Sequence, residues 1–235
     1  MKQLPLKLSL NPNSTFDNFF ANSNNAVVVN TLQHFVHDDE HFLYLWAQPG
    51  DGVTHLLEAV QHILSYPISC QYLPLKAVLD YPPEAITEGL EQLDIICIDD
   101  IDLVVNQPDW QQALFYLYNQ LRDGGKKLIV AGHCSPRELS IELQDLKSRL
   151  QWGAVLYLEP LDDEQKILAL KQKAKTLGMD VSDEVLNFIL SRVRRNNSAL
   201  YQVLSLLDQE SMAAKRKLTI PFVKQVLASG LLSLS

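Results

Sequence analysis

The chain has 235 residues, of which 47% are hydrophobic, enough to bury the cores of one medium-sized and one small domain. Its formal net charge of −8 argues against a protein that grips duplex DNA along its own surface. Cys70, Cys97 and Cys134 are odd in number and widely spaced, so no disulfide framework is indicated. No apolar run has the length of a signal peptide or a membrane span, and we expect a soluble, cytoplasmic protein.

The first 15 residues are rich in Asn, Ser and Pro and are typical of a flexible arm. From residue 16 onward, short apolar runs alternate with amphipathic helical segments such as 54–64 and 109–122. Runs of four to seven residues that are almost continuously hydrophobic are typical of buried parallel strands covered by helices on both faces. The alternation predicts an α/β domain over residues 16–159 with a five-stranded parallel sheet. The predicted strands are 42–47, 71–75, 94–99, 127–132 and 155–159.

After residue 159 the pattern becomes helical throughout. Acidic residues follow Asp162 in the first turn of a helix, where they suit the positive end of the dipole, and Gly178 ends that helix. Three further helix starts follow, at Ser182, at Asn197 or Ser198, and at Thr219. The sequence therefore predicts a small all-α lid domain over residues 160–235.

The segment after the first strand has the features of a phosphate-binding loop. Its glycines allow backbone N–H groups to converge on phosphate oxygens, and the following helix adds positive potential at its N-terminus. Compared with G-x-x-x-x-G-K-[ST], the segment has Ala47 for the first glycine and an apolar residue for the lysine. An ordinary strand-to-helix turn would carry the same glycines. The residues predicted to hold a nucleotide are Pro49, Gly50, Asp51, Gly52, Val53, Thr54 and His55.

A second feature makes the nucleotide site a stronger hypothesis. The predicted strand 94–99 ends in two carboxylates, Asp99 and Asp100, which is the Walker-B arrangement that places Mg²⁺ and an attacking water beside the phosphates. Thr54 and Asp99 would be the magnesium ligands if Mg²⁺ binds, and no other metal site is expected. The histidines at 34, 37 and 41 are more typical of a solvated loop than of a metal site.

Four segments together resemble the AAA+ ATPases, and within them the DnaA family. Residues 15–19 (TFDNF) resemble the opening of the DnaA ATPase domain, and 52–57 (GVTHLL) resemble its phosphate loop without the lysine. Residues 98–101 (IDDI) are similar to its Walker B, and 146–153 (LKSRLQWG) to the stretch that carries its arginine finger. The resemblance covers residues 15–235 and ends where the DNA-binding domain of DnaA would begin.

The two ends of the chain resemble the regulatory branch of that family, the inactivators of DnaA. Residues 3–8 (QLPLKL) are similar to an arm that binds the sliding clamp of DNA polymerase III (its β subunit), and 216–224 (RKLTIPFVK) to the C-terminal segment. The resemblance implies a negative regulator of replication initiation. Such a protein binds the DNA-loaded clamp, promotes ATP hydrolysis by DnaA and leaves inactive ADP–DnaA, so it would be nucleoid-associated through the clamp. The clamp-binding residues would be Gln3, Leu4, Leu6 and Leu8.

The family position of the arginine finger is Arg149, which would act in trans on the nucleotide of DnaA. The alternative is a local ion pair with Asp145, one helical turn earlier. Three departures weaken the chain's own site: Val53 replaces the lysine, Ser198 replaces a lid arginine and His133 replaces a polar sensor residue. Each lost charge-assisted hydrogen bond to phosphate costs about 1.5–3 kcal/mol. We therefore expect ADP or a related diphosphate as a structural ligand and no useful ATPase activity, and the sequence leaves open whether Mg²⁺ binds.

Two other functions stay open on the sequence. One is an autonomous AAA+ ATPase, and the other is a positive recruitment or loading factor for DnaA. Contact with DNA is expected to be indirect or weak, no membrane partner is expected, and a homo-oligomer is possible. The lid arginines that could touch DnaA or clamp-held DNA are Arg192, Arg194 and Arg195.

Overall fold

The computed structural model describes residues 10–64 and 67–228. The chain divides into two compact units. The larger consists of Met1–Gln48 and Val53–Glu159, and the smaller of Pro49–Gly52 and Pro160–Ser235. The tip of the predicted phosphate loop is thus grouped with the C-terminal helices.

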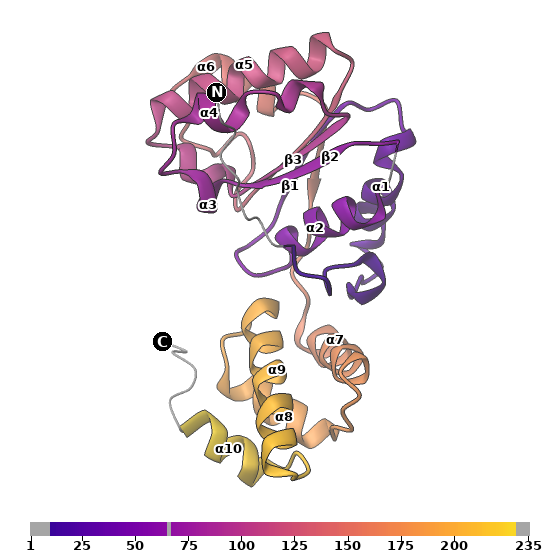
Figure 1. The fold of residues 1–235 in the computed structure, drawn as a ribbon. Helices are drawn as coiled ribbons and strands as arrows, with labels where there is room; N and C mark the ends of the chain where they lie inside the picture. Colours follow the sequence, from indigo (N-terminus) through magenta and orange to yellow (C-terminus); the bar gives the residue numbers. More distant parts are fainter. Residues whose placement is uncertain (1–9, 65–66, 229–235) are drawn as a thin grey trace. The chain divides into compact units, whose positions relative to one another are not determined.

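The larger unit contains a five-stranded parallel sheet in the order β2-β3-β4-β1-β5. Figure 1 shows this sheet with helices on both of its sides. This confirms the predicted α/β fold. The strands are β1 (Phe42–Trp46), β2 (Cys70–Pro74), β3 (Ile95–Asp99), β4 (Lys127–Gly132) and β5 (Ala154–Tyr157). All five residues of β3 are buried, as its unbroken apolar sequence predicts for a strand covered on both faces.

Helices cover the two faces of the sheet, each over its own hydrophobic cluster. One face packs against α1 (Ala26–His34) and α2 (Val53–Ile63), and α2 buries Val53, Leu56, Leu57 and Val60 at helical spacing. The other face packs against α3 (Leu75–Val78), α4 (Pro83–Thr87), α5 (Pro108–Asp123) and α6 (Gln144–Leu150). The described part of the unit also has four short 3-10 helices: η1 (Phe16–Asn18), η2 (Phe35–His37), η3 (Leu90–Gln92) and η4 (Ile101–Val104).

Strand β5 ends two residues earlier than the sequence predicts. The side chain of Asn25 accepts a hydrogen bond from the backbone N–H of Glu159 (2.9 Å) and donates one to its carbonyl (2.9 Å). Since Asn25 satisfies both backbone groups of Glu159, this residue has no need of a strand partner.

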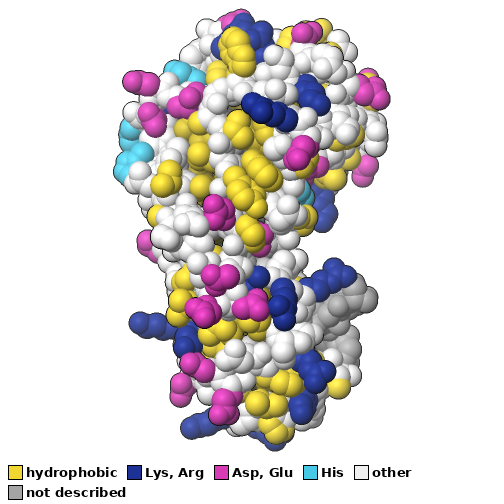
Figure 2. Space-filling model, turned by 180° about the vertical axis from the view of Figure 1, so that it is seen from behind, with side chains coloured by type: hydrophobic (Ala, Val, Ile, Leu, Met, Phe, Trp, Pro, Cys, Tyr) yellow, Lys and Arg dark blue, Asp and Glu magenta, His cyan; other side chains and the backbone are white. Residues whose placement is uncertain are grey.

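One face of the sheet is left open at its β5 edge. Val155 and Tyr157 lie beside Tyr44 and Trp46 of β1 in the parallel register, and they therefore point to the same face as those residues. Tyr44 is buried there, but Val155 and Tyr157 are 42% and 37% exposed. Hydrophobic side chains gather in the middle of the larger unit on the side of the molecule shown in Figure 2.

The smaller unit is all-helical in its described part, as predicted: α7 (Asp163–Thr176), α8 (Asp183–Arg192), α9 (Asn197–Ala214) and α10 (Ile220–Ala228). Asp162 and Gln165 form a capping box at the start of α7, which satisfies two backbone N–H groups. Gly178 follows that helix with φ +74°, the left-handed conformation expected of a C′ glycine. Ser182 occupies the N-cap position of α8, but its side chain makes no capping hydrogen bond.

Residues 10–15, the last part of the predicted arm, lie against α2. The carbonyl of Asn11 is 2.9 Å from His62 Nε2, and Ser14 is 2% exposed. The predicted clamp-binding residues Gln3, Leu4, Leu6 and Leu8 lie outside the described residues. Within the described part of the chain, no helix is both long enough and apolar enough to cross a membrane.

Candidate functional site

The loop between β1 and α2 depends on glycine at two positions. Gly50 and Gly52 have φ values of +89° and +110°, a region that L side chains rarely adopt. A Cβ atom at Gly50 would also lie 2.8 Å from the side chain of Asn196. Within the smaller unit, the Gly50 carbonyl accepts a hydrogen bond from the backbone N–H of Ser198 (3.0 Å). Ser198 therefore meets this loop through its backbone.

Val53 stands where a phosphate-binding lysine would begin α2. Its side chain is 4% exposed and belongs to the hydrophobic cluster that α2 forms with the sheet. The position thus supplies apolar packing where a lysine would supply an ammonium group. In the same loop, burial raises the pKa of Asp51, although Lys166 opposes that shift.

Asp99 lies at the carboxyl end of β3 and is 1% exposed. Its Oδ2 accepts hydrogen bonds from the Thr54 hydroxyl (2.7 Å) and the Tyr72 hydroxyl (2.9 Å), and its Oδ1 accepts one from the Asp100 N–H (2.9 Å). Burial raises the pKa of Asp99, and the hydroxyl donors partly oppose this shift by favouring its charged form. The structure brings together Thr54 and Asp99, the predicted pair, and adds Tyr72 to them.

This arrangement fits a magnesium ion in part. Thr54 Oγ1 and Asp99 Oδ2 are the hydroxyl and carboxylate oxygens that Mg²⁺ takes in phosphate-loop proteins. The same Asp99 oxygen is already shared by two hydroxyl donors, so an ion would have to displace them. Within the described ranges, no group of three His, Cys, Asp or Glu side chains is arranged to hold a metal.

Asp100, the second Walker-B acid, faces an imidazole. It has φ +60°, a left-handed conformation that is uncommon outside glycine, and its Oδ1 lies 3.5 Å from His133 Nε2. The Asp100 carboxylate raises the pKa of His133 above its usual range, while burial opposes the shift. The backbone N–H of His133 donates to Asp102 Oδ2 (2.7 Å), which holds the end of β4 in place. The acid that would orient an attacking water is therefore engaged by a neighbouring side chain.

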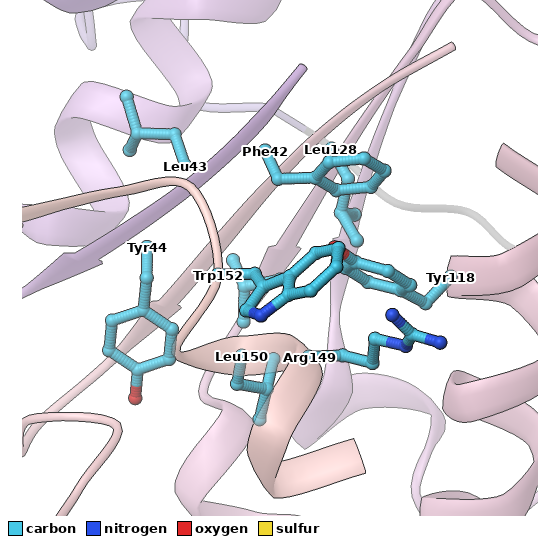
Figure 3. A pocket seen from close by; sticks show the side chains of 9 residues that line it. Phe42, Leu43, Tyr44, Tyr118, Leu128, Arg149, Leu150 and Trp152 are labelled. Atoms are coloured by element: carbon cyan, nitrogen blue, oxygen red, sulfur yellow. The ribbon is translucent and has the colours of Figure 1, made fainter. Parts of the chain in front are cut away.

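Arg149 lies in the last turn of α6. Its guanidinium carbon is 5.1 Å from the ring centre of Trp152 and 5.8 Å from that of Tyr118. The three side chains line one pocket, in which Figure 3 shows Arg149 beside the two rings. In the described part of the chain no carboxylate forms an ion pair with Arg149, and Asp145 is not its partner. The structure thus presents a cation held by aromatic rings.

The remaining predicted residues are spread over both units. The imidazole of His55 is 2.8 Å from the Thr15 carbonyl and packs near the Phe19 ring, so it contacts the N-terminal segment. Of the lid arginines, Arg195 pairs with Asp163 (3.1 Å) and Arg192 lies over the ring of Phe188.

Comparison with protein families decides the membership of the chain. A model described as the bacterial DnaA ATPase domain matches residues 10–157, and a model described as the Hda lid domain matches residues 163–227. The chain belongs to the DnaA family of AAA+ proteins. The lid match identifies it further as a DnaA-homologous protein of the Hda type.

Individual relatives agree with this membership. An uncharacterized protein of Haemophilus influenzae is 39% identical over 229 residues, which cover 96% of this chain and 98% of that protein. Domain III of the replication initiation protein DnaA from Thermotoga maritima has a TM-score of 0.82 at 24% identity, covering 94% of this chain and 98% of that one. AMPPCP-bound DnaA from Aquifex aeolicus has a TM-score of 0.73 at 20% identity, covering 88% and 70%. These structural likenesses show the DnaA-type fold.

Sequence reasoning missed two parts of the site. Tyr72 reaches Asp99 from the neighbouring strand β2, and Tyr118 and Trp152 enclose Arg149 from α5 and from the turn after α6. The only sequence signal for the role of Tyr72 is a polar hydroxyl within a predicted buried strand. The signal for the role of Trp152 is a large aromatic residue next to a glycine, three residues after the predicted arginine finger.

Proposed function

We propose that this DnaA-family protein is a negative regulator of chromosomal replication initiation. Bound to the sliding clamp on DNA, it would stimulate ATP hydrolysis by the initiator DnaA and leave the inactive ADP form. The observation that carries the proposal is the state of Arg149. Its guanidinium has no carboxylate partner in the described part of the chain, while the chain's own phosphate loop carries Val53 in place of a cation. The chain can therefore offer an arginine to another protein's nucleotide.

Arg149 would act on the reaction in the active site of DnaA. Water attacks the γ-phosphorus of ATP held there, the bond to the β-phosphate oxygen breaks, and ADP and phosphate are the products. Negative charge builds up on the leaving and equatorial oxygens in the transition state. A planar guanidinium with several N–H donors suits those oxygens, and an arginine supplied in trans accelerates hydrolysis about 10³- to 10⁵-fold in known cases.

The chain's own nucleotide site would bind ADP or a related diphosphate as a structural ligand. Its glycine turn and the N-terminus of α2 supply backbone N–H groups, which suffice for a weakly held phosphate. Solved relatives support an adenine nucleotide, since DnaA from Aquifex aeolicus binds AMPPCP. If Mg²⁺ binds, Thr54 and Asp99 would hold it. Without a cation at residue 53, and with Asp100 beside His133, we expect this site to hydrolyse ATP poorly.

The N-terminal arm would bring the protein to DNA. Gln3, Leu4, Leu6 and Leu8 would bind the sliding clamp as an extended peptide whose leucines enter an apolar pocket. Deleting residues 1–8 is expected to abolish clamp binding in a surface plasmon resonance assay. Unchanged affinity of the deleted protein for the clamp would refute this part of the proposal.

The test of the function follows a single turnover of DnaA. DnaA is loaded with radiolabelled ATP, freed of excess nucleotide and mixed with the clamp loaded on DNA. Conversion of labelled ATP to ADP is then followed with and without this protein. Arg149→Ala should reduce the rate to that of DnaA alone. Arg122→Ala, which removes an arginine paired with Asp123 on α5, is the matched control and should keep the stimulation.

The outcomes separate the rival functions. Stimulation that survives Arg149→Ala would refute the finger. Slower hydrolysis with more DnaA at the origin would indicate a positive recruitment factor, and ATP turnover in the absence of DnaA would indicate an autonomous ATPase.

A further inference from the structure

We propose that Trp152 and Tyr118 are positioning residues that hold the guanidinium of Arg149 between their rings and direct its N–H groups outward toward a partner's triphosphate. The inference rests on the proposed function of Arg149. It adds the means by which a long side chain is kept ready to act.

Trp152 is placed where packing alone does not explain a tryptophan. Its side chain is 58% exposed, yet its ring lies over Arg149 with 5.1 Å between the guanidinium carbon and the ring centre. The next residue, Gly153, has φ +83°, and a Cβ there would lie only 2.1 Å from the Phe42 carbonyl oxygen. Because this turn passes so close to β1, the backbone that carries Trp152 is fixed against the sheet.

Tyr118 forms the other wall and is closely packed. It is 2% exposed and stacks on Phe42 with ring centres 4.2 Å apart. Its hydroxyl is buried and has no hydrogen-bond partner, so the contacts of the ring and not a hydrogen bond determine where it lies. Burial raises the pKa of Tyr118, and the positive charge of Arg149 opposes that shift most strongly, which is consistent with their proximity. Figure 3 shows the Arg149 side chain next to both rings.

The nature of the contact is what makes it a positioning device. A carboxylate partner would take up the N–H donors of the guanidinium, whereas an aromatic ring attracts the cation through its face and leaves the donors free. Nothing in the described ranges pairs with Arg149 through a carboxylate. The rings therefore restrict the movement of the side chain while its hydrogen-bonding edge stays available for phosphate oxygens.

The experiment measures the single-turnover rate of DnaA against the concentration of this protein, with clamp and DNA present. The maximal rate reports how well Arg149 acts once bound, and the half-saturating concentration reports binding. Trp152→Ala should lower the maximal rate about 3- to 30-fold and change the half-saturating concentration less than about twofold. Trp152→Phe, which restores a ring, should recover most of the rate, while Trp152→Leu, which restores only apolar bulk, should behave like the alanine variant.

A matched control is Tyr81→Ala, which removes a 42% exposed aromatic side chain elsewhere in the same unit and should leave both quantities unchanged. Trp152→Ala should also leave the urea midpoint of unfolding close to that of the parent, since the side chain is exposed.

The results distinguish this inference from the proposed function. If Arg149→Ala abolishes stimulation but Trp152→Ala keeps the full maximal rate, the positioning role is refuted and the finger stands. A raised half-saturating concentration with an unchanged maximal rate would make Trp152 a docking contact and would also overturn the inference, as would full activity of Trp152→Leu. If Arg149→Ala itself has no effect, the proposed function fails.

Discussion

Removing the Tyr72 hydroxyl tests whether Asp99 depends on donors from its own chain. The hydroxyl donates to a carboxylate oxygen at 2.9 Å, and the carboxylate is 1% exposed, so water cannot replace the lost bond without opening the core. A hydrogen bond to a charged group contributes about 1.5–3 kcal/mol, whereas one to a neutral group contributes about 0.5–1.5 kcal/mol. Tyr72→Phe should therefore lower the free energy of unfolding by about 1.5–3 kcal/mol.

The matched control is Tyr44→Phe in the same sheet. The Tyr44 hydroxyl donates to the neutral carbonyl of Cys134 (3.1 Å), so this variant should lose only about 0.5–1.5 kcal/mol. In an Asp99→Asn background, the effect of Tyr72→Phe should fall to the same range. Unfolding in urea can be followed by tryptophan fluorescence, since all three tryptophans, Trp46, Trp110 and Trp152, belong to the larger unit.

The effect should also depend on pH in a defined direction. The Tyr72 hydroxyl favours the charged form of Asp99, so removing it raises the pKa of that carboxyl further in the folded state. The destabilisation by Tyr72→Phe should therefore be largest at high pH and shrink as the pH falls through the folded pKa of Asp99. Equal losses for Tyr72→Phe and Tyr44→Phe, independent of both pH and residue 99, would refute the reasoning.

Three further predictions concern other parts of the chain. The carboxylate of Asp100 raises the pKa of His133, so the stability that this pair contributes should be complete below the unfolded pKa of about 6.5 and be lost as the pH rises through the folded pKa. NMR titration of the His133 imidazole measures its folded pKa. The free energy of unfolding of His133→Gln, measured against pH, should lack this pH dependence. Gly153→Ala should lower the free energy of unfolding by more than about 3 kcal/mol, because its Cβ would collide with a backbone oxygen of β1. Gly125 has φ +64° and open space around it, so Gly125→Ala should lower the free energy by only about 1–2 kcal/mol. Unfolding in urea compares the two variants. Asp162→Ala removes the capping box of α7 and should lower the stability of the helical unit by about 1 kcal/mol, measured by circular dichroism.

Much of the fold could be predicted because burial imposes a local pattern. The apolar run of β3 and the helical spacing of α2 follow from which faces are covered, and each predicted strand is found within two residues of its predicted bounds. The ends were harder to place, because they depend on distant partners. Asn25 ends β5 through a contact across more than 130 residues, and α3 begins directly after β2 at Leu75, a residue that the sequence placed in the strand.

The candidate site shows the same division. The pairing of Thr54 with Asp99 follows from the two motifs, since the phosphate loop and the carboxyl end of the Walker-B strand serve the same phosphates and Mg²⁺ even though β4 lies between β1 and β3. The contribution of Tyr72 could not be predicted, because it depends on the register between β2 and β3. The rings around Arg149 come from α5 and from the turn after α6. These segments meet because both pack against Phe42, and no local sequence pattern predicts such a contact.

The most direct test of the central claim, that the chain promotes chemistry in a partner's pocket and not in its own, is ATP hydrolysis by the purified protein alone. With Mg²⁺ present and DnaA, clamp and DNA absent, release of labelled phosphate should stay at the level of a protein-free blank, because Val53 supplies no cation and Asp100 faces His133. Steady turnover of about 1 s⁻¹ or faster, an ordinary enzyme rate, would contradict the claim.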